Sequence, residues 1–134
     1  MDERFEESRQ RTGPFLTSGA LGFVVPHAAP EYSGTVAGAV YRSLQKQRPE
    51  RIVVLAFPHR GGLHGIASPD TDTVATPFGE VEIERQFGGG FAQVAEARVC
   101  DHSFEIQLPY LQKSRQGSDD CVQCGRSRRC RSFR

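Results

Sequence analysis

The sequence has no tryptophan, a single methionine and no long apolar run. A membrane-spanning helix needs about 18 or more consecutive apolar residues, and no stretch of this chain approaches that length. The N-terminus, residues 1–7, is acidic and lacks the apolar core of a secretory signal, so we expect a cytoplasmic protein without a membrane partner. The 134 residues, 37% hydrophobic and 25% charged, are typical of one small globular domain.

The net charge of +1 conceals an uneven distribution. Residues 1–113 contain 11 basic and 14 acidic residues, whereas residues 114–134 contain six arginines and two aspartates. This C-terminal tail has one valine and one phenylalanine as its only large apolar residues, too few to order it by burial. The chain also lacks a recognisable nucleic-acid-binding motif, so we expect no nucleic-acid partner.

Three of the four cysteines, Cys121, Cys124 and Cys130, lie in the tail. A metal site is one interpretation, but closed zinc sites have four ligands and no fourth follows. A phosphate-binding arm is a second interpretation, but Phe133 is the only aromatic residue among the arginines. We favour a third interpretation, in which residues 114–134 are an out-of-frame or otherwise unrelated terminus.

Two short apolar runs, residues 20–25 and residues 51–56, predict buried strands. Between them, apolar residues recur at helical spacing from Ser33, the expected N-cap, to Gln47. A strand–helix–strand unit places its two strands parallel in one sheet. We therefore predict an α/β domain with three layers and a mostly parallel sheet.

Weaker patterns predict further elements. Residues 66–68 and 81–83 are compatible with short strands. A helix capped by Asp101 or Ser103 follows, and Pro109 is expected to kink it. Residues 1–19 give no clear element.

Two histidines occupy equivalent positions, because His27 follows the first apolar run and His59 follows the second. The carboxyl ends of parallel strands lie at one edge of a sheet, so both imidazoles are expected there. Such a pair could bind a divalent metal ion such as Fe(II), Cu or Zn. The alternative is that each is a loop residue whose ring bonds only to nearby backbone.

His102 is a third candidate, and here the alternatives remain open. Beside Asp101 and near Glu105, its imidazole could transfer protons as a catalytic acid or base, orient a metal ligand, or merely begin a helix. His64 lies in a glycine-rich loop and is expected to be solvated.

Four motifs together resemble the Memo-like proteins, also called AmmeMemoRadiSam system protein B. They are Pro-His-Ala at 26–28, Pro-His-Arg at 58–60, Thr-Pro-Phe-Gly at 76–79 and Asp-His-Ser-Phe-Glu-Ile-Gln-Leu-Pro-Tyr at 101–110. The resemblance covers residues 20–113, and family members continue well beyond that point. Where the family commonly has histidine before Leu-Pro, this chain has Gln107.

The resemblance implies a fold like that of class III extradiol dioxygenases, with a non-haem metal site in a cleft. His27 and His59 would be its first two ligands, and a radical-SAM enzyme and a small-molecule substrate would be partners. On this basis residues 20–113 are the N-terminal half of the domain and the chain is inactive. Two functions remain open: a protein derived from a metal-dependent oxidoreductase, and a non-enzymatic metal-binding or protein-interaction module.

Overall fold

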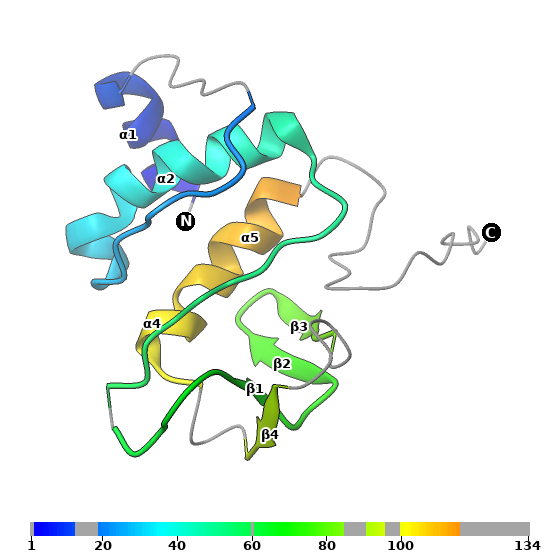
Figure 1. Ribbon diagram of the computed structural model, residues 1–134. Coiled ribbons are helices and arrows are strands. Elements are labelled where there is room, and N and C mark those ends of the chain that lie inside the picture. The colour runs from blue at the N-terminus through cyan, green and yellow to red at the C-terminus, as the bar shows by residue number, and fades with distance from the viewer. Residues whose placement is uncertain (1, 13–18, 60, 85–90, 96–99, 116–134) are drawn as a thin grey trace.

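A computed structural model describes residues 2–12, 19–59, 61–84, 91–95 and 100–115 (Figure 1). The described part combines helices with two small sheets, as an α/β domain does. Its elements are α1 (Asp2–Thr12), α2 (Pro30–Gln47), β1 (Ala67–Pro69), β2 (Thr73–Thr76), β3 (Gly79–Glu82), β4 (Ala92–Val94), α4 (His102–Glu105) and α5 (Gln107–Arg115). None of the helices in these ranges is long and apolar enough to cross a membrane.

Helix α2 begins three residues before the expected N-cap. Ala29 is the N-cap and Pro30 opens the first turn, where its missing N–H costs nothing because that group has no helical partner. Ser33 lies within the first turn of α2 instead, and its hydroxyl donates to the Ala28 carbonyl at 2.8 Å. The C-terminal end agrees with the prediction, since the helix closes at Gln47 with Arg48 in the left-handed conformation.

Helix α1 is not predicted from the sequence, because its residues are mostly charged and no apolar stripe is evident. Glu–Arg pairs three or four residues apart stabilise such a helix, and Glu7 contacts both Arg4 and Arg11 at 2.9 Å. The helix packs on α2 at two glycines. A Cβ at Gly38 would lie 3.0 Å from the Cβ of Ser8, so the close approach requires the small residue.

The C-terminal helical region is two helices rather than one kinked helix. The break lies between α4 and α5, upstream of Pro109. Proline cannot donate to the carbonyl four residues earlier and its ring collides with it, so the chain restarts at Gln107 and places Pro109 in the first turn. The helix continues to Arg115, past the expected domain boundary at residue 113. Residues 116–134 of the predicted tail lie outside the described residues.

The prediction of a three-layer domain on a mostly parallel sheet is not met by the described residues. Residues 20–25 and 51–56 are extended and run in the same direction in Figure 1, but neither enters a strand ladder with a described residue. The ladders are a parallel pair, β1 with β4, and an antiparallel hairpin, β2 with β3. A parallel sheet requires a ladder of backbone hydrogen bonds between neighbouring strands. Residues of both segments line one cleft instead, and they form no such ladder with a described residue.

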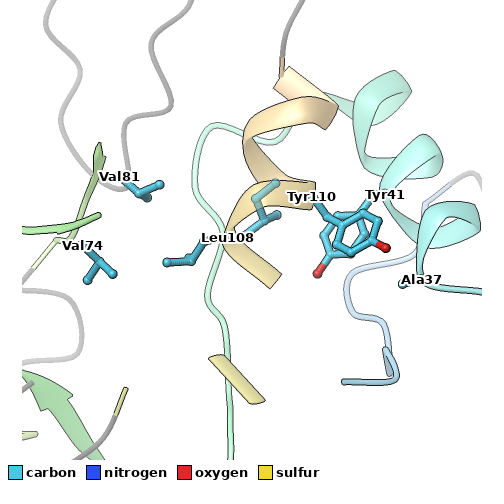
Figure 2. Packing of buried hydrophobic residues seen from close by; sticks show 7 residues of the cluster. Ala37, Tyr41, Val74, Val81, Leu108 and Tyr110 are labelled. Carbon is cyan, nitrogen blue, oxygen red and sulfur yellow. The ribbon is translucent and has the colours of Figure 1, made fainter. Parts of the chain in front are cut away.

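The core joins α2 and α5 to the β2–β3 hairpin (Figure 2). Tyr41 and Tyr110 stack with ring centroids 5.2 Å apart, and burial raises the pKa of the Tyr41 hydroxyl. Val74 and Val81 face one another in the hairpin and are both buried. Figure 2 shows Leu108 between the valine pair and the tyrosine pair, so this leucine links the two halves of the core.

Truncation of Leu108 to alanine is expected to destabilise the chain by about 2–5 kcal/mol, because the cavity would lie at the centre of the core. Leu108 is 2% exposed, whereas Val36 on α2 is 60% exposed and provides the control. Val36→Ala is expected to change the free energy of unfolding by less than about 0.5 kcal/mol. Urea denaturation followed by circular dichroism measures both, and similar values for the two variants would contradict this description of the core.

Candidate metal centre

Three histidines from distant parts of the sequence converge at one place. His27 lies between the first extended segment and α2, His59 follows the second extended segment, and His102 is the first residue of α4. One nitrogen from each ring can be chosen so that all three lie within 4.8 Å of one another. The structure therefore brings the two expected ligands together and adds His102 at the same range.

The three rings form a closed triangle. The centroid separations are 5.1 Å between His27 and His59, 5.7 Å between His27 and His102, and 4.3 Å between His59 and His102. All three side chains are exposed, so the open side of the triangle faces solvent. Three imidazole rings this close can present their nitrogens to one cation.

Asp101 fixes the position of His59. One oxygen, Oδ2, accepts the backbone N–H of His59 at 2.6 Å and lies 3.1 Å from its ring nitrogen Nδ1. The other oxygen, Oδ1, accepts the backbone N–H of Ser103 at 2.9 Å and so caps α4. A single carboxylate thus joins the loop that carries His59 to the helix that carries His102.

The Ser103 hydroxyl also donates to Oδ1 at 2.7 Å. This bond is the largest cause, and the backbone and His59 bonds are further causes, of a pKa of Asp101 well below its ordinary value. Asp101 is therefore an acceptor only, and the Nδ1 of His59 must donate its proton to it. In a neutral ring this leaves Nε2 as the nitrogen with a free lone pair. Carboxylates orient metal-binding histidines in this way in many proteins.

Ser103 and Gln107 position the segments that lead to the histidines. The Ser103 hydroxyl lies 2.7 Å from the carbonyl two residues before His59, and the Gln107 amide donates at 3.4 Å to the carbonyl directly before His27. The Tyr41 hydroxyl donates to the other end of the Gln107 amide. Gln107 stands where the family motif commonly has histidine. In this chain it is buried and hydrogen-bonded.

The donor set fits a first-row transition metal ion. Imidazole is a good ligand for Fe, Cu and Zn. Bond lengths of about 2.0–2.1 Å to zinc place tetrahedral ligand atoms about 3.4 Å apart. Small rotations of the exposed rings, whose ligand atoms lie within 4.8 Å of one another, would therefore close the site. Three protein ligands leave at least one coordination position open, as catalytic sites do.

The remaining candidates lie elsewhere. His64 is exposed in its loop, as expected, and is not part of the histidine cluster. Cys100 is half-buried, packs against the core and forms no disulfide with a described residue. Sequence reasoning identifies Asp101 as a helix cap but misses its contact with His59, because nothing local connects residues 42 positions apart.

Replacement of Asp101 by alanine is expected to cost about 0.5–2 kcal/mol of stability, because α4 loses its N-cap, and asparagine should recover most of the loss. The negative charge of Asp101 makes a second contribution to stability, which depends on pH. Because the folded-state pKa is lowered, its contribution is full above the unfolded-state pKa of about 3.9 and declines as pH falls toward the folded-state value. The difference in unfolding free energy between the natural chain and Asp101→Asn should therefore be smaller at pH 3 than at pH 5. Urea denaturation at both pH values measures it, and equal differences would contradict this role.

Comparison with known proteins identifies relatives across much of the chain. A family model described as Memo-like protein matches residues 1–122. MEMO1 family proteins of Aeropyrum pernix and Methanosarcina barkeri are 37% identical over 102 residues and 40% identical over 97 residues, and each alignment covers 69% of this chain. A MEMO1 family protein of Archaeoglobus fulgidus is 34% identical over 110 residues, or 78% of this chain.

This chain spans little more than a third of the length of those relatives. The alignments cover 36% of the Aeropyrum and Methanosarcina proteins and 41% of the Archaeoglobus protein. No solved structure gives a significant match to the chain. All three clustered histidines and Asp101 lie within the range of the family model. On these matches, the chain belongs to the Memo-like protein family.

Proposed function

We propose that this chain binds a divalent transition metal ion through His27, His59 and His102. The observation that supports the proposal is the convergence of three imidazoles, whose ligand atoms lie within 4.8 Å although the residues are far apart in the sequence. Histidines that served only as separate loop residues would not be expected to lie this close together. Fe(II), Cu and Zn are the ions that such a donor set favours.

Each residue has a distinct part in this proposal. His59 offers Nε2 because its Nδ1 donates to the Asp101 carboxylate. His27 and His102 supply the other two nitrogens from the loop before α2 and from the start of α4. Metal binding requires neutral rings, so protons compete with the ion and binding should weaken on acidification. Because the ligands meet only in the folded chain, binding should also stabilise the fold.

Calorimetric titration with Zn²⁺ and anaerobic Fe²⁺ tests the histidine site. The chain should carry Cys121→Ser, Cys124→Ser and Cys130→Ser, because thiolates of the tail could bind zinc independently. One ion is expected to bind per chain, and substitution of any one of the three clustered histidines by alanine should abolish this binding. His64→Ala is the matched control and should bind as the parent does, because His64 lies outside the cluster.

Asp101→Asn adds a finer test, with an expected loss of about 10–100-fold in metal affinity because His59 is no longer oriented by a charge. Binding that survives all three histidine substitutions would refute the proposal. So would binding that depends only on the tail cysteines.

A second candidate function is a metal-dependent oxidation inherited from an oxidoreductase. It is favoured by the exposure of all three rings, which leaves room for a small oxygen-bearing substrate at the open side of the site. The bound ion would supply the redox chemistry. Within the chain, His102 could instead serve as a proton donor or acceptor if the ion were held by His27 and His59.

Oxygen uptake with catechol separates the two functions. An iron-loaded, full-length Archaeoglobus relative is expected to consume oxygen if the family site is an oxidoreductase. The same assay with the iron-loaded form of this chain shows whether its exposed site alone supports turnover. Metal binding without oxygen uptake by either protein would favour the non-enzymatic module. For an active protein, His102→Gln that retains metal but loses turnover would assign His102 to proton transfer.

A further inference from the structure

Residues of the two extended segments line one cleft of about 640 Å³. Residues 20–23 and Val25 belong to the first segment, and residues 51–57 belong to the second. The lining residues that helices α2 and α5 add include Val40, Tyr41, Leu44 and Leu111. Small-molecule sites in proteins are typically clefts of about 300–1,000 Å³ with a mainly apolar lining. This cleft has the size and the lining of such a site.

One end of the cleft lies at the histidine cluster. His27 lines the cleft, together with Phe57 and with Ser103, the residue that follows His102. The Phe57 ring also contacts the His59 ring edge to face, with centroids 5.6 Å apart. The three histidines offer ligand atoms within 4.8 Å of one another. A molecule that lies in the cleft and reaches His27 therefore arrives at the metal site proposed above.

The cleft carries little charge away from this end. Residues 52–56, which separate Phe57 from Arg51, are all apolar. Among the described residues that line the cleft, Arg51 is the only one whose side chain is always charged, and its Nε lies 3.0 Å from the Glu84 carboxylate. Burial of apolar surface is favourable, whereas burial of an unpaired charge is costly. The middle of the cleft therefore favours an uncharged, apolar part of a ligand.

The cleft is also long. Extended chain advances about 3.3 Å per residue, so the segment from Arg51 to Phe57 covers roughly 20 Å. Figure 1 shows that the two extended segments run in the same direction, so their residues follow the same line. A ligand that contacts the lining over this length and also reaches His27 is elongated, with its polar end beside the histidines.

We propose that the cleft binds the hydrocarbon chain of an elongated small molecule, with the chemistry of a medium-chain aliphatic carboxylate, whose oxygen-bearing head reaches the histidine site. The position of the head rests on the metal site proposed above, whereas the position of the chain rests on the cleft alone. Three histidine ligands leave a coordination position open, and carboxylate oxygens are good ligands for zinc. The apolar chain meets residues 52–56 and the apolar side chains of α2 and α5.

Calorimetric titration with octanoate, decanoate and dodecanoate tests the position of the chain. The protein is the full chain with Cys121→Ser, Cys124→Ser and Cys130→Ser, kept metal-free with EDTA and titrated at carboxylate concentrations below micelle formation. Affinity is expected to rise about three- to fourfold with each added methylene, because each methylene removes apolar surface from water. Equal affinity for all three carboxylates would overturn the proposal.

Zinc tests the position of the head. Zn²⁺ is first titrated into the same protein without carboxylate, so that a failure of the proposed metal site is seen separately. In the zinc-loaded protein, decanoate is expected to bind about tenfold more tightly or better, because its oxygen gains a metal ligand position. 1-Decanol has the same chain without the carboxylate and should gain less than about twofold.

Gly22→Glu and Val40→Glu are the blocking variants. Both residues line the cleft, and a Cβ added at Gly22 meets no atom within 4 Å, so the free chain can accommodate that change. Each carboxylate should weaken decanoate binding by at least about tenfold, since an apolar chain would have to desolvate it. Val36→Glu is the matched control, because Val36 lies one turn before Val40 on α2 but is 60% exposed and outside the cleft. It should bind decanoate as the parent does, and circular dichroism checks that all three variants are folded.

Rising affinity with chain length, a zinc-dependent gain for decanoate alone and loss of binding in the blocking variants together support the proposal. Decanoate binding that persists in both blocking variants would overturn it. Zinc that binds without strengthening decanoate binding would overturn the position of the head, and absence of zinc binding would refute both the metal site and that position. Light scattering adds one more outcome, since a dimer that binds none of the carboxylates would make a second copy of this chain the occupant.

Discussion

The arrangement of the site depends on the carboxylate of Asp101. Its two oxygens accept hydrogen bonds from two separate parts of the chain, the His59 loop and the first turn of α4. The Ser103 hydroxyl lies at the same junction, 2.7 Å from both the Asp101 carboxylate and the Phe57 carbonyl, and its single proton serves these two acceptors. The low pKa of Asp101 follows from its hydrogen bonds and keeps the group in its accepting form. Helix capping and histidine orientation therefore depend on one side chain.

The core supports this arrangement from beneath. Leu108 and Tyr110 hold α5 against both α2 and the hairpin, and α4 leads directly into α5. The amide of Gln107 at the start of α5 reaches the carbonyl before His27. Thus His27 and His59 are exposed on loops and His102 is exposed at the start of α4, while the residues that position them lie closer to the core. This division is common where a scaffold carries a binding site on its loops.

Sequence patterns locate the histidines more successfully than they locate the sheet. His27 and His59 follow two apolar runs that were expected to be parallel strands of one sheet, and their rings lie 5.1 Å apart in the structure. The same runs fail as paired strands among the described residues, because pairing depends on a partner that local sequence cannot reveal. Helix α1 escapes prediction because ion pairs and a glycine contact, rather than an apolar stripe, hold it. Pro109 is expected to kink a helix, but its steric effect falls on the preceding turn and divides the helix instead.

The contact between α1 and α2 has a consequence for the dynamics of the chain. Gly34 and Gly38 permit close approach, and the fully buried Ser8 lies at the contact, so the surfaces that meet are small and partly polar. Apolar contact comes mainly from Phe5, whose ring stacks on Tyr110 with centroids 5.8 Å apart, and the glycine contact itself adds little to the heat capacity of unfolding. Helix α1 is therefore coupled to the Leu108 core through the Phe5–Tyr110 stack, so that local opening of this helix would expose an aromatic ring of the core to solvent.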